Sequence, residues 1–504
     1  MQRSPNKLIP NDLATVPGLD ALGLAQVRLG AADAQPEVLG VGVTADADVP
    51  AQIGLSREAL TSLGFEAKPG QTLLLPRSEE PDLIAVGLGE TAELTAAGVR
   101  DGAAALVRAA ASRASIAVRF VAEALDRTVL VRSIVEGALL ARYRYSVLQS
   151  DAKRIDLTEL VIEGADEADR GAVDTGLVAV RAAVVARDLA NTPPGHLTAT
   201  NMGEIAVELG DRFGFDVEVH DKQQLIDLGC GGLLGVNQGS IEEPRMIVLR
   251  YRPEEEPTGR LGLIGKGIMY DSGGISLKPS DPMHLLMKMD MGGAAAVLGA
   301  FTGLRDAGAS VEVVGWLMCT DNMPSSTAYK LGDVLTARNG TTIEVKNTDA
   351  EGRLAMSDAF ALANEDRVDA IVDIATLTGA ALVSLGGHVA ALLGNDDRMI
   401  DAVRAASDET DEQVWQLPLV RKYRPQLDSD IADISNLGGP FAGTITAALF
   451  LDHFAGKTPW AHLDIAGTMQ VEKDDSWRTR GATGFGARLL LQFATDFTAP
   501  DREE

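Results

Sequence analysis

Residues 261–279 read Leu261-Gly-Leu-Ile-Gly-Lys-Gly-Ile-Met-Tyr-Asp-Ser-Gly-Gly-Ile-Ser-Leu-Lys-Pro279, and the prediction of the fold starts from them. Its first four residues, 261–264, are a short apolar run that predicts a buried strand, and this strand delivers Lys266 and then Asp271. The Gly273-Gly274 pair follows, where the backbone can turn sharply or approach a ligand closely. In open α/β sheets ligands collect at the carboxyl ends of strands, so this stretch predicts a functional strand end.

The sequence around this stretch alternates between strand-like and helix-like segments. The predicted strands are residues 38–43, 83–89, 115–121, 157–163, 246–251, 311–319, 341–345 and 369–376, and the predicted helices are residues 56–65, 91–110, 129–143, 292–307 and 353–364. Such alternation favours an α/β fold with a mixed, mostly parallel central sheet.

A long predicted helix divides the chain into two parts. It covers residues 166–190 and stops at Asn191-Thr-Pro-Pro, because a Pro-Pro pair cannot continue a helix. We therefore expect a smaller N-terminal α/β domain over residues 1–165, a connecting helix, and a larger C-terminal α/β domain over residues 191–504.

Composition excludes several classes of function. The 504 residues include 72 Asp and Glu against 45 Lys and Arg, a formal charge of −27. Such a chain is not expected to bind the phosphates of nucleic acid or an anionic membrane, but it can bind metal cations. Only two cysteines occur, Cys230 and Cys319, so a Cys-rich metal site is excluded. Residues 1–7 show no secretory signal and no apolar run approaches 18 residues, so a cytoplasmic protein is expected.

Familiar catalytic motifs are missing from the sequence. None of the six histidines starts an H-E-x-x-H pattern, and neither a G-x-S-x-G elbow nor a complete phosphate-binding loop occurs. Carboxylates and lysines therefore remain as the candidates for catalysis.

Three segments gather such residues next to predicted strand ends or helix starts. They are residues 266–278, Lys288-Met-Asp290, and Asn347-Thr-Asp-Ala-Glu-Gly-Arg-Leu354. Taken singly, Asp290 is most simply a helix cap, and Asp349 with Glu351 a polar turn. Together, carboxylates from three loops would repel one another unless a cation held them ionised, and two divalent metals would supply that charge.

These residues carry a resemblance to a known family. Residues 347–354 resemble the signature octapeptide of the leucyl (cytosol) aminopeptidase family, and residues 266–279 resemble its first metal-binding segment. The similarity covers essentially all of residues 187–490. The N-terminal region is similar to the family's variable, macro-like domain only in its α/β pattern. The resemblance implies a metallo-aminopeptidase that removes N-terminal residues, preferably Leu- or Met-like, through a metal-bridging hydroxide.

The resemblance also implies the ligands of two divalent metals, Mn²⁺ or Zn²⁺. Lys266, Asp271, Asp290 and Glu351 would hold the tighter metal. Asp271, Asp349 and Glu351 would hold the exchangeable one, so that two carboxylates bridge. A lysine binds a metal only when neutral, so the metals would have to lower the pKa of Lys266 far below its usual value.

The remaining implied roles concern catalysis and the substrate. Lys278 would stabilise the oxyanion, and Arg353 would hold a bicarbonate ion that acts as general base. The residues expected to bind the substrate side chain are Met287, Thr376, Leu377, Gly379, Ala466 and Met469. Family members are homohexamers with active sites facing an interior cavity, which implies short peptides as substrates.

The sequence departs from the family pattern between two of the expected ligands. Asp271 and Asp290 are 19 positions apart, where the usual pattern has 18, and the extra residue falls in residues 280–286. We expect this loop to bulge and Asp290 to stay in place. Leu331 stands where a proline is common, which predicts only a minor loop effect.

Two other readings remain open from the residues alone. One is a DNA-binding or regulatory protein with a vestigial peptidase site, although the charge of −27 predicts weak or absent DNA binding. The other is a carboxylate two-metal phosphatase, for which a lysine ligand would be unusual. Cleavage of peptides or of phosphoesters would separate them.

Overall fold

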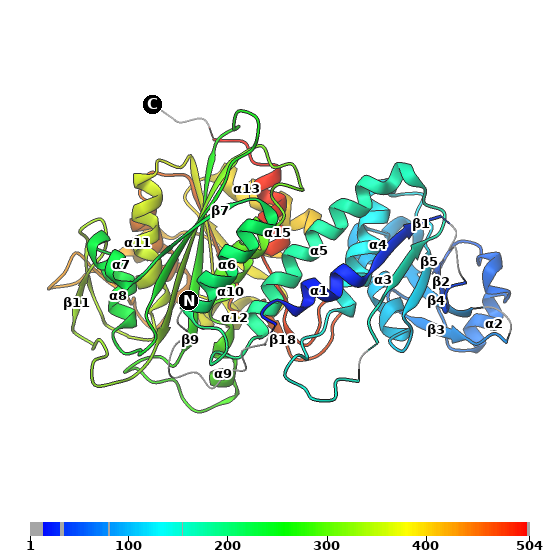
Figure 1. Cartoon of the computed structure of the whole chain (residues 1–504), viewed down its shortest axis with the longest axis horizontal. Coiled ribbons are helices and arrows are strands. Elements are labelled where there is room, and N and C mark those ends of the chain that lie inside the picture. The colour runs from blue at the N-terminus through cyan, green and yellow to red at the C-terminus, as the bar shows by residue number, and fades with distance from the viewer. Residues whose placement is uncertain (1–13, 31–34, 79–80, 154, 501–504) are drawn as a thin grey trace. The chain divides into compact units, whose positions relative to one another are not determined.

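The computed structural model describes residues 14–30, 35–78, 81–153 and 155–500 (Figure 1). The expectation for residues 1–7 concerns a segment outside these ranges. Among the helices within them, none combines the length and the apolar character that crossing a membrane requires. The chain forms two compact units: Val16–Val184 with Val471–Gly481, and Val185–Gln470 with the chain from Ala482 on. The division falls inside α5 (Arg170–Asn191), the long helix that the sequence predicts.

The first unit is a six-stranded sheet with helices. Its strands are β1 (Gln26–Leu29), β2 (Val38–Thr44), β3 (Thr72–Leu75), β4 (Asp82–Gly89), β5 (Ser115–Arg119) and β6 (Glu159–Ile162), in the order β1-β6-β5-β2-β4-β3. All neighbours are parallel except β3, which runs antiparallel to β4. The helices are α1 (Pro17–Leu24), α2 (Arg57–Ser62), α3 (Ala96–Ala109) and α4 (Arg127–Arg142). Aliphatic side chains of α3, α4 and the sheet form its core.

The second unit contains an eight-stranded mixed sheet. Its order is β15-β14-β17-β13-β9-β10-β8-β7, and its central strands β17, β13, β9 and β10 are parallel. The strands are β7 (Asp216–His220), β8 (Arg245–Tyr251), β9 (Arg260–Asp271), β10 (Glu312–Asn322), β13 (Ala370–Ala375), β14 (Ala390–Gly394), β15 (Val414–Gln416) and β17 (Trp460–Asp464). A smaller sheet of this unit is formed by β11 (Val334–Thr336), β12 (Thr342–Glu344) and β16 (Ile434–Ser435). A two-stranded sheet is formed by β18 (Gln470–Val471) and β19 (Gly481–Ala482), whose residues Val471 and Gly481 belong to the first unit.

Helices cover both faces of the eight-stranded sheet (Figure 1). The helices of this unit are α6 (Ala199–Phe213), α7 (Lys222–Leu228), α8 (Gly231–Asn237), α9 (Pro282–Leu285), α10 (Gly292–Phe301), α11 (Gly352–Glu365), α12 (Gly379–Leu385), α13 (Asp397–Thr410), α14 (Gly443–Ala455) and α15 (Ala487–Thr495). On β9, the Cα of Gly265 faces Ala294 of α10, and the next side chain, Lys266, contacts Gly352 of α11. Because successive strand residues point to opposite faces, α10 and α11 lie on opposite sides of β9.

The mixed, mostly parallel α/β fold is confirmed, and the predicted bounds differ most from the structure in three elements. The predicted strand 261–264 is much longer and continues through Lys266 to Asp271 as β9. The predicted helix 91–110 is a 3₁₀ turn followed by α3, which begins at Ala96 because the Thr95 hydroxyl caps it by accepting from the Gly98 N–H. The predicted helix 292–307 ends at Phe301 and continues as turns.

Candidate metal centre and substrate pocket

The candidate site lies where parallel strands end. β9 carries Lys266 and ends at Asp271, β10 ends at Asn322, and Thr376 follows β13 directly. Asp464 is the last residue of β17. Because β17, β13, β9 and β10 are parallel, their carboxyl ends meet at one edge of the sheet, as the sequence predicts for a ligand site in an α/β fold.

Two glycines shape the turn after β9. Gly273 has φ of +87° and Gly274 has φ of +65°, in the left-handed region that glycine adopts without strain. A Cβ on Gly273 would lie 2.8 Å from Oδ1 of Asp349, and one on Gly274 would lie 2.8 Å from Oδ1 of Asn322. The glycine pair therefore permits both the sharp turn and the close approach that the sequence predicts.

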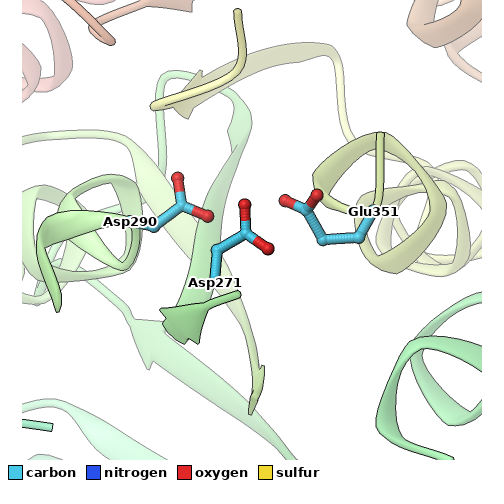
Figure 2. A group of neighbouring side chains, drawn as sticks. All are labelled: Asp271, Asp290 and Glu351. Atoms are coloured by element: carbon cyan, nitrogen blue, oxygen red, sulfur yellow. The ribbon is translucent and has the colours of Figure 1, made fainter. Parts of the chain in front are cut away.

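Three buried carboxylates converge beside this turn. Asp271, Asp290 and Glu351 each place an oxygen within 4.8 Å of the others, and Figure 2 shows their side chains pointing toward one another. Asp290 follows a 3₁₀ turn that leads into α10, and Glu351 immediately precedes α11. All three are almost inaccessible to solvent. One strand and two helix starts thus bring together the acids of the three sequence segments.

Lys266 joins two of these acids. Its Nζ lies 2.8 Å from Asp290 Oδ1 and 2.8 Å from Glu351 Oε1, and it also donates to the carbonyl oxygen of Thr376 at 2.9 Å. Burial alone would lower the pKa of Lys266, but the carboxylates of Asp290 and Glu351 outweigh it and raise the pKa above its usual value. Lys266 must release its proton before its nitrogen can serve as a metal ligand.

Lys278 joins Asp271 to a fourth acid, Asp349. Its Nζ lies 2.9 Å from Asp271 Oδ2 and 2.7 Å from Asp349 Oδ1. Burial lowers the pKa of Lys278, while the charges of Asp271, Glu351 and Asp349 raise it by more, so the ammonium form is favoured. Asp349 is the most exposed of the four acids, with about a third of its side chain (32%) accessible to solvent. This places Asp349 at the open side of the cluster.

Crowding of like charges shifts the protonation of the acids. Burial, opposed by Lys266 and reinforced by Glu351, raises the pKa of Asp290 well above its usual value. Burial and the Glu351 carboxylate likewise raise the pKa of Asp271. Glu351 is the exception, because Lys266 and Lys278 together outweigh its burial and lower its pKa. The cluster therefore favours additional positive charge.

The residues present fit a divalent metal. Oδ2 of Asp290 is buried and accepts no hydrogen bond from the described residues. Buried acceptors of this kind are normally satisfied, so an open carboxylate oxygen inside a cluster of carboxylates marks a position for a cation. Carboxylate oxygens suit Mg²⁺, Mn²⁺ and Zn²⁺, and a neutral lysine nitrogen suits the transition metals among them.

A cavity of about 300 Å³ opens beside the cluster. It is lined by Lys278 and all five expected ligands, and also by every residue expected to bind the substrate side chain: Met287, Thr376, Leu377, Gly379, Ala466 and Met469. Met289, Leu286 and Leu382 add further apolar surface. The charged cluster and these apolar side chains therefore form walls of one cavity.

Arg353 lies apart from this lining. It is the second residue of α11, is 5% exposed, and donates from Nη1 to the carbonyl oxygen of Asn436 at 2.9 Å. Its Nε is buried and has no hydrogen-bond partner among the described residues. Burial lowers the pKa of Arg353 to about 10. The Nε of Arg353 could donate to an anion such as bicarbonate. That Arg353 holds bicarbonate stays a prediction.

The loop with the extra residue is folded locally. Residues 282–285 form the short helix α9, which the Asp281 side chain caps by accepting from the His284 N–H at 3.0 Å. A 3₁₀ turn, Leu286–Met289, leads from it to Asp290. The structure thus places Asp290 in the carboxylate cluster with the longer loop present.

Two asparagines that support the site were missed by reasoning from sequence. Nδ2 of Asn322 donates to Asp271 Oδ1 at 2.8 Å and to the carbonyl of Thr348 at 2.9 Å. Asn436 accepts from the Lys346 N–H at 2.8 Å, and its Nδ2 donates to the carbonyl of Asn347. They fix the Asp271 carboxylate and the loop before α11. A single sequence offers no signal that separates such asparagines from those of ordinary loops.

Both predicted domains of the chain are similar to known proteins. Residues 184–491 match the cytosol aminopeptidase family, catalytic domain, and residues 44–152 match its N-terminal domain. A probable cytosol aminopeptidase of Chlorobaculum tepidum is 44% identical over 376 residues, which cover 72% of this chain and 74% of the relative. One of Roseiflexus castenholzii is 41% identical over 449 residues, covering 86% and 91%.

A solved structure is similar over almost the whole chain. It is the bottromycin maturation enzyme BotP in complex with Mn, with a TM-score of 0.84 and 38% identity, covering 91% of this chain and 99% of BotP. Both domains, the carboxylate cluster and these relatives lead to one assignment: the chain belongs to the cytosol aminopeptidase family of metal-dependent aminopeptidases.

Proposed function

We propose that the protein is a two-metal aminopeptidase that releases Leu- or Met-like residues from the N-termini of short peptides. The observation that carries this proposal is the carboxylate cluster of Asp271, Asp290 and Glu351, which lines the same cavity as a set of apolar side chains. A free α-amine and a scissile carbonyl can reach the cluster while the side chain occupies the cavity. That arrangement confines cleavage to the first residue of a peptide.

We assign the ligands as the resemblance implies. Lys266, Asp271, Asp290 and Glu351 would hold the tighter ion, and Asp349 would join the bridging acids Asp271 and Glu351 around the second. The exposure of Asp349 supports a more readily exchanged second ion. Mn²⁺ or Zn²⁺ bound there would supply a water nucleophile at neutral pH and polarise the scissile carbonyl.

The other residues act on the substrate. Lys278 stays an ammonium in this environment and lies beside the cluster, so it is suited to stabilise the developing oxyanion. Arg353 would hold bicarbonate as the general base, using the buried Nε that has no partner among the described residues. Met287 and Met469 give the cavity flexible walls that tolerate several apolar side chains.

The proposal extends to assembly and location. We infer a homohexamer in the cytoplasm, with residues 1–165 as a separate N-terminal domain, residues 166–190 as the connecting helix, and residues 191–504 as the catalytic domain. The names of the relatives, which are cytosol aminopeptidases, support the location. A DNA-binding role with a vestigial site is not favoured, because the expected ligands converge. Sizing of the purified protein tests the hexamer.

Metal loading combined with hydrolysis tests the function. Protein treated with chelator should not cleave leucine p-nitroanilide, and Mn²⁺ or Zn²⁺ should restore cleavage. Metal analysis should find two ions per chain, and Asp290→Ala should lose at least one of them. Folded, metal-loaded protein that cleaves no substrate with a free α-amine would refute the activity, and unchanged metal content in Asp290→Ala would refute the ligand assignment.

A further inference from the structure

One buried carboxylate outside the metal cluster is bonded to two walls of the substrate cavity. Asp464 is 1% exposed and ends β17. Its Oδ1 accepts from the backbone N–H groups of Leu377 at 3.2 Å and Thr378 at 3.3 Å, both in the loop after β13. The same oxygen accepts from the N–H of Ala466 at 3.2 Å, in the loop after β17.

The second oxygen of this carboxylate accepts a hydrogen bond from a side chain of the same loop. Thr378 Oγ1 donates to Asp464 Oδ2 at 2.6 Å, and it also accepts from the Ala381 N–H at 3.1 Å as the cap of α12. Asp464 therefore fixes both the backbone of the loop and the start of the helix behind it. Four bonds to one buried carboxylate are costly to break, because each lost partner leaves a polar group buried.

The loop that Asp464 holds connects the cavity with the metal cluster. Thr376 donates from Oγ1 to Asp290 Oδ1 at 2.7 Å, and its carbonyl oxygen accepts from Lys266 Nζ at 2.9 Å. Leu377, Gly379 and Ala466 line the cavity. A shift of this loop would therefore change the shape of the cavity and its distance from the cluster together.

From these contacts we infer that Asp464 is a positioning residue that sets side-chain specificity, because it fixes Leu377 and Ala466, which lie on two different loops and line the same pocket. It touches neither the cluster nor the substrate directly and acts through the two loops. This inference rests on the proposed aminopeptidase function. Its consequence is selective: a large side chain, which needs both walls in place, depends on Asp464 more than a methyl group does.

The test compares leucine and alanine p-nitroanilides on the Mn²⁺-loaded protein. Asp464→Ala should lower the leucine-to-alanine ratio of kcat/KM by about tenfold or more, with two metal ions still bound. Asp464→Asn keeps an oxygen acceptor for the backbone N–H groups and should retain more of the ratio. The matched control is Asp358→Ala, which removes a buried carboxylate that accepts from the Leu233 and Arg338 N–H groups, each at 2.9 Å, away from the cavity.

The outcomes separate this inference from the proposed function. A ratio within twofold of the wild type in folded Asp464→Ala, or an equal fall in Asp358→Ala, would overturn the inference. If Asp464→Ala does not fold, Thr378→Val is the second variant. It removes the bond to Oδ2 together with the Oγ1 contacts to the Ala381 N–H and to Thr444, and it keeps the backbone bond to Oδ1. This variant must lower the ratio, and an unchanged ratio overturns the inference. If the wild-type protein cleaves neither anilide, the proposed function is refuted but the inference about Asp464 is not. The affinities of each variant for free leucine and free alanine, measured by calorimetry, then test the inference.

Discussion

Gly352→Ala should disturb the metal cluster from a position that carries no chemistry of its own. Gly352 is the first residue of α11. A Cβ there would lie 2.5 Å from Cε, 2.7 Å from Cδ and 2.8 Å from Nζ of Lys266. A normal contact needs about 3.5–4.0 Å, so the lysine must move by about 1 Å. Lys266 is not free to move, because its Nζ is held by Asp290, Glu351 and the carbonyl of Thr376.

The magnitude follows from those contacts. Moving Nζ by about 1 Å breaks buried ion pairs with two carboxylates, and breaking a buried pair typically costs about 3–5 kcal/mol. The change from Gly to Ala at a helix position returns at most about 1 kcal/mol. We therefore expect Gly352→Ala to lower the free energy of unfolding of chelator-treated protein by about 2–4 kcal/mol. Misplacement of a site residue by about 1 Å should also reduce kcat/KM by about 100-fold.

Urea unfolding followed by circular dichroism measures the first effect, and hydrolysis of leucine p-nitroanilide measures the second. The matched control is Gly171→Ala in α5, where, apart from its chain neighbours and the backbone of the same helix, no heavy atom of the described residues lies within 4 Å of the new Cβ. That variant should be as stable as the wild type or slightly more so. The reasoning would be refuted if Gly352→Ala unfolded at the wild-type urea concentration and kept its activity within threefold.

Three further predictions concern other parts of the chain. Lys278→Met should lower kcat by about 100- to 1,000-fold with little change in KM, if Lys278 stabilises the oxyanion; steady-state kinetics decides, and a change confined to KM would contradict that role. Burial raises the pKa of Cys230 to about 12 and also raises the pKa of Cys319. Neither thiol should therefore react with a thiol reagent at pH 8 until urea unfolds the protein. Rapid reaction of the native protein would contradict the burial of the two cysteines. Glu136→Gln removes the charge of the carboxylate that lies 2.8 Å from Arg100 and 2.7 Å from Arg132. Thermal unfolding of the first unit should then begin at a temperature several degrees lower. An unchanged transition temperature would mean that these ion pairs add nothing to stability.

Periodicity predicted the fold better than it predicted the ends of elements. The apolar run predicts a strand that stops at Ile264, and glycine weakens a strand, yet Gly265 and Gly267 are interior residues of β9. A Cβ on Gly265 would lie 2.7 Å from the Cα of Ala294, so the glycine is required by the close packing of α10. Packing of distant segments decided the strand, and a local pattern does not contain that information.

In the candidate site, too, local motifs predicted some residues, while others depend on how distant segments pack. Its charged members lie in three motifs with specific spacing, so Lys266, Asp271 and Glu351 were named from sequence. Asp464 and Asn436 act through bonds to backbone groups of segments that lie about 90 residues earlier in the chain. Such bonds depend on which strand ends become neighbours in the folded sheet. The supporting residues therefore became visible only with the tertiary structure.

The two lysines of the cluster bear on the order of assembly. Asp271, Asp290, Asp349 and Glu351 carry four negative charges when ionised, and Lys266 and Lys278 offset two of them from within the chain. These built-in counter-ions spare the polypeptide from having to capture metal while it folds. We therefore expect the chain to fold without metal and to bind its ions afterwards.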